Sequence, residues 1–172
     1  MKKLLTAMAI ASAISFSPAV VPFDAAPSLT ATAEAAAAPD AALTNLRDGS
    51  DTSITALAAD KPLFLNFWAS WCPPCVGEMP HINAMYQKYG DRVNFAAVSI
   101  DTSADDARSF TEGQGANLDL PFYYGDEMAL AQAYQIQAIP ISLMIAPGGE
   151  IIAQHVGGMT ADELDQFISS AL

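Results

Sequence analysis

Two cysteines, Cys72 and Cys75, lie in the segment FWASWCPPCVGEMP at residues 67–80. Two cysteines at this spacing can form a structural disulfide, provide half of a metal site, or act as a redox pair. A structural disulfide here would close a very short loop, so it would stabilise the fold little. A zinc site needs four ligands, which His81 and His155 could complete only if folding happened to bring them close. The spacing therefore favours a redox pair.

The elements on either side of the cysteines bear on their reactivity. Residues 62–68, PLFLNFW, are a nearly unbroken apolar run, which is typical of a strand buried on both faces of a sheet. Residues 76–89 carry apolar side chains at helical spacing, and proline suits the first turn of a helix. We therefore expect a helix that begins at or within residues 72–75. Cys72 would be the exposed nucleophile at its positive end, and Cys75, one turn on, the more buried resolving thiol.

The rest of the chain alternates between strand and helix signals, which predicts one α/β layer sandwich. The polar centre DGSD within residues 43–57 predicts a β-hairpin. The other predicted strands span residues 93–100, 120–125, 139–145 and 150–156, and the other predicted helices span about 102–112, 126–134 and 160–172.

The first 42 residues are excluded from the predicted domain. Residues 1–26 pair Lys2 and Lys3 with an apolar run, so we predict a signal peptide or an N-terminal membrane anchor. Residues 27–42 are alanine-rich and of low complexity, and we predict a linker there. Residues 43–172 then form the folded domain. The location would be periplasmic or otherwise extracytoplasmic, with the domain soluble after cleavage or anchored at its N-terminus.

The chain is strongly acidic, with a net charge of −12. Such a charge should repel nucleic acid and anionic lipid headgroups, and no basic cluster offsets it. We therefore expect no nucleic-acid partner.

The segment NFWASWCPPCVGEMP resembles the active-site segment of the thioredoxin superfamily, in particular its TlpA/ResA branch of exported thiol-disulfide oxidoreductases. The resemblance covers nearly all of residues 43–172 and includes AIPISLMIAPGGEII and the late Gly157-Gly158 pair. It implies a thioredoxin-like fold: a central mixed sheet flanked by helices, with an N-terminal β-hairpin and a central strand-helix insertion around residues 101–134.

The resemblance also implies roles for individual residues. Ile139-Pro140 should be a cis peptide beside the two sulfurs, with the neighbouring backbone free to pair with an extended substrate. The expected substrate-binding residues are Trp71, Pro73, Pro74, Ile139 and Pro140. Trp71 would shield the sulfurs and contribute to the substrate surface, with packing in the core as the alternative, whereas Trp68 would pack in the core or near the site.

Two positions depart from ordinary thioredoxin. Asn66 occupies the place of a buried aspartate and cannot accept the proton that Cys75 must lose. The TlpA/ResA branch carries an acid in the helix instead, and Glu78 matches it. We predict that Glu78 is catalytic with Cys72 and Cys75, by deprotonating the thiols or altering their pKa. The alternative is that a first-turn glutamate only favours the helix dipole.

The implied activity is reduction of protein disulfides by a Cys72–Cys75 dithiol, with no cofactor and no metal. Substrates in that branch include cysteines of apocytochrome c or of copper-centre assembly proteins, and a membrane thiol donor would restore the dithiol. An oxidant or isomerase is one alternative. A metallochaperone or haem-handling module that uses Met79 or His81 with the cysteines is the other.

Overall fold

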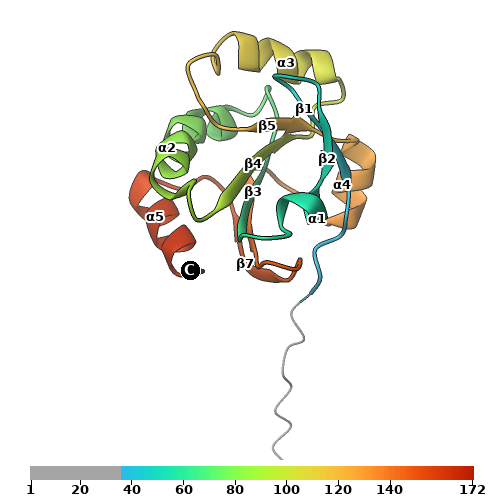
Figure 1. Ribbon diagram of the computed structural model, residues 1–172. Helices are drawn as coiled ribbons and strands as arrows, with labels where there is room; N and C mark the ends of the chain where they lie inside the picture. The colour runs from blue at the N-terminus through green and yellow to red at the C-terminus, as the bar shows by residue number, and fades with distance from the viewer. Residues whose placement is uncertain (1–35) are drawn as a thin grey trace, which may run out of the picture. The chain divides into compact units, whose positions relative to one another are not determined.

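The computed structural model describes residues 36–172. Their centre is a mixed sheet of seven strands (Figure 1). The strands lie in the order β2-β1-β5-β4-β3-β6-β7. They are β1 (Ala42–Asn45), β2 (Asp51–Ser53), β3 (Leu63–Trp68), β4 (Asn94–Ser99), β5 (Phe122–Tyr124), β6 (Ile141–Ile145) and β7 (Ile151–Val156). The helices are α1 (Ile54–Leu57), α2 (Pro73–Tyr89), α3 (Ala104–Glu112), α4 (Glu127–Ala133) and α5 (Ala161–Ser169).

The predicted signal peptide or anchor lies outside the described residues. Within residues 36–172, no helix has both the length and the apolar character needed to cross a membrane.

Strand β3 is the centre of the sheet, and all six of its residues are buried. It pairs in parallel with β4 and antiparallel with β6. Because β3 and β4 are parallel, their carboxyl ends meet at one edge of the sheet, where Trp68 pairs with Ser99. The segments that follow β3 and β4 therefore come close together. The segment that follows β3 carries the two cysteines.

Helices cover both faces of the sheet (Figure 1), and aromatic side chains on the two faces of β3 contact them. Phe64 packs against Phe167 of α5, and Trp68 packs against Phe110 of α3. Helix α2 lies beside α5 on this face. Since side chains alternate along a strand, Phe67 points to the other face, where it contacts Tyr134 at the end of α4. The predicted thioredoxin-like fold, with helices on both sides of a mixed sheet, is confirmed.

The N-terminal hairpin differs in detail from the prediction. Strands β1 and β2 pair antiparallel as expected, but the second arm ends after three residues and continues as helix α1. Ser53 caps this helix by accepting a hydrogen bond from the backbone N–H of Ala56. A serine in this position satisfies a free helix N–H, which gives the helix a start that the apolar pattern did not reveal.

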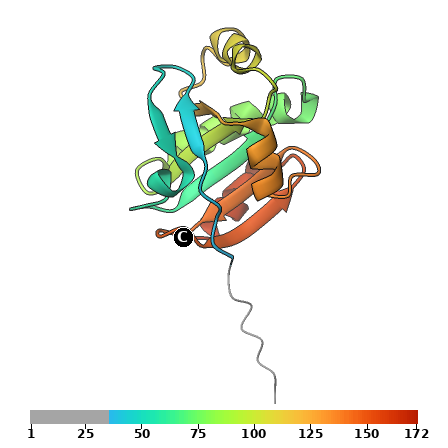
Figure 2. The same cartoon turned by 90° about the vertical axis from the view of Figure 1, so that its right-hand side faces the viewer.

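Residues 36–41, which the composition assigned to a linker, are held against the domain (Figure 2). The Ala38 N–H donates to Gly149 at 2.7 Å, and the Ile151 N–H donates to Ala36 at 2.9 Å. The Tyr134 hydroxyl donates to the Pro39 carbonyl at 2.6 Å. All three contacts use backbone groups of residues 36–41, which we call the N-terminal strap. Its alanine-rich composition therefore did not indicate them.

Candidate active site

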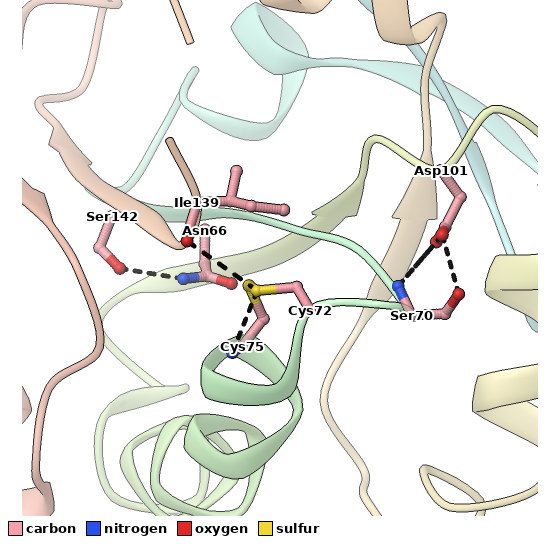
Figure 3. Close-up of a disulfide and its surroundings, with 7 residues drawn as sticks. All are labelled: Asn66, Ser70, Cys72, Cys75, Asp101, Ile139 and Ser142. Carbon is pink, nitrogen blue, oxygen red and sulfur yellow. Dashed lines mark hydrogen bonds between the residues drawn. A yellow bond between two sulfur atoms is a disulfide. The ribbon is translucent and has the colours of Figure 1, made fainter. Parts of the chain in front are cut away.

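Cys72 and Cys75 form a disulfide at the N-terminus of α2, with an S–S distance of 2.04 Å (Figure 3). Cys72 is the N-cap of the helix, and Pro73 takes the first helical position, where no backbone N–H is needed. The Cys75 N–H points at the Cys72 sulfur at 3.3 Å. A sulfur in this position is stabilised as a thiolate by the free N–H groups and the dipole of the helix.

The prediction that Cys72 is exposed is wrong, because the side chain is only 4% exposed and Cys75 is fully buried. The Cys72 sulfur lies 3.9 Å from the carbonyl oxygen of Ile139, in the segment that leads into β6. This segment covers the sulfur, although Ile139 lies 67 residues after Cys72 in the sequence. The prediction that Cys75 is more buried than Cys72 is confirmed.

The Ile139-Pro140 peptide is cis, as the resemblance implied, and it borders the disulfide. The carbonyl of Pro140 accepts a hydrogen bond of 2.9 Å from the N–H of Gly157. Gly157 has a φ of 107°, a conformation that favours glycine. The turn after β7 thus fixes the segment beside the sulfurs.

The side chains around the disulfide form an apolar surface. Trp71 is 65% exposed, so it does not pack in the core, and Pro73 and Pro74 are exposed beside it. Ile139 is half-buried and Pro140 is buried. Trp68 is completely buried between Phe110 and Phe122, as predicted for a core residue.

Glu78 lies one turn after Cys75 on the buried face of α2 and is 3% exposed. Its Oε1 accepts a hydrogen bond of 2.8 Å from the N–H of Met159, just before α5. Its Oε2 has no hydrogen-bond partner among residues 36–172. Burial raises the pKa of Glu78 to about 7, against the smaller lowering effect of the Met159 N–H. This carboxyl can therefore change its protonation state near neutral pH.

Asp101 holds the loop between β3 and the cysteines, a role that the sequence analysis missed (Figure 3). It is 1% exposed and follows the end of β4. Its carboxylate accepts hydrogen bonds from the Ser70 N–H at 3.0 Å, the Ser70 hydroxyl at 2.8 Å and the Ser99 hydroxyl at 2.7 Å. The available signal was an aspartate directly after a buried strand that is parallel to β3.

Comparison with known proteins bears on this arrangement. The sequence model of the family described as Redoxin matches residues 33–168. The chain belongs to the Redoxin family. This match, together with the relatives named ResA, confirms the predicted membership of the thioredoxin superfamily and the predicted likeness to ResA.

Two relatives of this chain carry names that describe their chemistry. The chain is 34% identical over 109 residues to the thiol-disulfide oxidoreductase ResA of Halalkalibacterium halodurans, covering 63% of this chain and 61% of that one. It is 31% identical over 142 residues to ResA of Geobacillus kaustophilus, covering 82% and 79%. The match to the first relative thus spans about three fifths of its length.

A solved structure shares the fold. The Chlorobium tepidum protein assigned as the thiol:disulfide interchange protein DsbE superposes with a TM-score of 0.69 at 29% identity. The superposition covers 80% of this chain and 96% of that one.

The two histidines of this Redoxin chain lie in different places. His81 is exposed on α2, and His155 is half-buried on β7 near Phe167. No group of three or more His, Cys, Asp or Glu side chains within residues 36–172 is arranged to hold a metal ion.

Proposed function

We propose that the protein is an extracytoplasmic thiol-disulfide oxidoreductase that reduces disulfides of other proteins through Cys72 and Cys75. The observation that carries this proposal is the Cys72–Cys75 disulfide at the N-terminus of α2, directly beside the Ile139-Pro140 peptide. The ResA relatives, named as thiol-disulfide oxidoreductases, support the same class of reaction.

The reaction consists of two thiol-disulfide exchanges. The Cys72 thiolate attacks one sulfur of a substrate disulfide, forms a mixed disulfide and releases the first substrate thiolate. Cys75 loses its proton and attacks the Cys72 sulfur, which breaks the mixed disulfide and releases the second substrate thiolate. Two electrons pass to the substrate, the proton from Cys75 and one proton from solvent neutralise its two thiolates, and the Cys72–Cys75 disulfide remains. A membrane thiol donor then returns two electrons and two protons to the pair.

Glu78 accepts the proton that Cys75 loses. The pKa of about 7 supports this role, since a group with a pKa near the working pH can both take up and release a proton. Its position one turn from Cys75, on the same buried face of α2, also supports it.

The substrate segment lies across the apolar surface of Trp71, Pro73 and Pro74. Their exposure beside the disulfide supports this placement. The backbone at Ile139 and Pro140 would pair with the extended substrate in the manner of an added strand.

The proposed location outside the cytoplasm rests on Lys2, Lys3 and the apolar run that follows them, a pattern typical of a secretory signal. The proposed substrates are cysteine pairs of apocytochrome c or of copper-centre assembly proteins.

Insulin reduction tests the activity. The full-length protein with dithiothreitol should precipitate the insulin B chain much faster than dithiothreitol alone, and Cys72→Ser should abolish the acceleration. The control is His81→Ala, which removes an exposed side chain of α2 and should leave the rate unchanged. A wild-type rate equal to that of dithiothreitol alone would contradict the proposal.

The reduction potential of the pair decides the direction of the reaction. A value near about −270 mV favours a reductant, and a value near about −120 mV favours an oxidant. Stoichiometric copper or zinc binding by the reduced protein, without insulin reduction, would favour the metallochaperone instead.

A further inference from the structure

Asn66 is a completely buried polar residue in the middle of the central strand β3. Side chains alternate along a strand, so Asn66 shares its face with Phe64 and Trp68, which contact α5 and α3. The N-terminus of α2, with the cysteines, lies over this same face (Figure 3). The Asn66 side chain therefore lies beneath the redox pair.

One end of the Asn66 carboxamide is held in place. Its Nδ2 donates a hydrogen bond of 3.0 Å to the hydroxyl of Ser142, the residue paired with it on β6. Ser142 is also completely buried. This bond fixes the plane of the carboxamide and determines where its oxygen points.

The other end of the carboxamide lacks a partner. Oδ1 of Asn66 is buried and accepts no hydrogen bond from any of residues 36–172. Figure 3 shows this oxygen directed toward the two sulfurs. Buried amide oxygens are nearly always paired, because leaving one without a donor costs free energy.

The redox state of the cysteines determines whether a donor is available. In the disulfide neither sulfur carries a hydrogen. Reduction adds two electrons and two protons from a thiol donor, breaks the S–S bond and gives Cys75 an S–H group, which is a hydrogen-bond donor. Cys75 is completely buried on the sheet side of α2, so its S–H is shielded from water.

We propose that Asn66, positioned by Ser142, accepts a hydrogen bond from the Cys75 thiol in the reduced protein and thereby favours the dithiol over the disulfide. The proposal rests on the proposed function for its place in turnover. Asn66 is a positioning residue that acts through Cys75.

The hydrogen bond also separates the roles of the two cysteines. A bond to the neutral thiol raises the pKa of Cys75, whereas the helix N-terminus favours the thiolate of Cys72. Cys72 is then the thiolate that meets a substrate, and Cys75 stays protonated until the mixed disulfide has formed.

Equilibration of full-length protein with glutathione buffers tests the proposal. Asn66→Leu, which removes the acceptor at similar size, should shift the equilibrium about tenfold toward the disulfide, equivalent to about 30 mV. Ser142→Ala, which frees the carboxamide, should shift it in the same direction by less. The matched control is Asn94→Leu, which removes an amide bonded to the Leu57 carbonyl at the start of β4 and should leave the equilibrium unchanged. An equilibrium constant for Asn66→Leu within twofold of the wild type, or a shift toward the dithiol, would overturn the proposal.

The titration of Cys75 is a second readout. In a Cys72→Ser background, Asn66→Leu should lower the pKa of Cys75, measured by thiolate absorbance. A higher pKa would mean that the carboxamide presents its NH₂ group to the sulfur, and it would overturn the proposal.

An infrared measurement serves if Asn66→Leu does not fold. The S–H stretching band of Cys75 in the Cys72→Ser protein should lie at the lower frequency of a hydrogen-bonded thiol. A band at the frequency of a free thiol would overturn the proposal. None of these measurements uses a protein substrate, so they can fail while insulin is still reduced, and they can succeed when it is not.

Discussion

Two ionisable groups near the start of α2 have opposite surroundings. The Cys72 sulfur faces the N–H of Cys75 at the helix N-terminus, which favours negative charge. The Glu78 carboxyl, one turn further on, is buried with a single N–H donor, and its pKa rises to about 7. The same short helix segment thus promotes a thiolate at one position and retains a proton at another.

Glu78 should make the fold less stable as the pH rises. The folded protein keeps a proton on Glu78 between pH 4.5 and about 7, where the unfolded chain has already released it. The free energy of unfolding should therefore fall by on the order of 3 kcal/mol across this range. Urea denaturation of the oxidised wild type and of Glu78→Gln at several pH values measures this loss.

The glutamine of Glu78→Gln does not titrate. The loss of stability due to Glu78 should therefore appear in full as a pH-dependent difference in the free energy of unfolding between the wild type and Glu78→Gln. The acids with lowered pKa values, such as Asp40 and Asp165, titrate below this range and act equally in both proteins. A difference that stays constant between pH 4.5 and 8 would contradict the raised pKa.

At the scale of elements, the site is the edge where the carboxyl ends of β3 and β4 meet. Strand β3 leads into the cysteines, and β4 leads into Asp101, which binds the backbone and hydroxyl of Ser70. The loop that carries Trp71 and Cys72 is therefore fastened to the neighbouring strand.

Asp101→Ala should lower the free energy of unfolding by about 3 kcal/mol, because it leaves the Ser70 N–H and the buried Ser99 hydroxyl without their acceptor. Urea denaturation measures the loss. The control is Asp105→Ala, which removes an exposed ion pair with Arg108 and should cost less than about 1 kcal/mol. Equal losses in the two variants would show that Asp101 does not hold the loop.

Local patterns predicted the elements that carry the cysteines, because each signal lies within a few residues. The apolar run to Trp68 and the prolines after Cys72 place the strand-to-helix junction correctly. Local patterns could not predict the contact between Cys72 and Ile139 or the hydrogen bonds between Ser70 and Asp101. They join residues 67 and 31 positions apart, and only the strand order of the sheet brings these together.

In the whole molecule, the N-terminal segment of residues 36–41 is likewise held by residues that lie far from it in the chain. Residues 36–41 were assigned to the linker by composition, but they dock through backbone hydrogen bonds to residues 149 and 151. Pairing of this kind places no demand on side chains, so an alanine-rich segment can join a sheet without an apolar pattern.

The protein is proposed to act on other proteins, and its acidic charge affects which of them it meets readily. A net charge of −12 favours encounter with partners whose surface is neutral or basic. The contact itself would be made by the apolar surface of Trp71, Pro73 and Pro74.

Trapping of the mixed disulfide tests the central claim most directly. Full-length Cys75→Ser, reduced and mixed with a protein that contains an accessible disulfide, should accumulate a covalent complex, since the residue that resolves it is missing. Mass spectrometry of the digested complex should locate the bond at Cys72, and dithiothreitol should release both proteins. The wild type should give no such complex, and Cys72→Ser should give much less. Absence of a complex with Cys75→Ser, or a bond at a residue other than Cys72, would contradict the account.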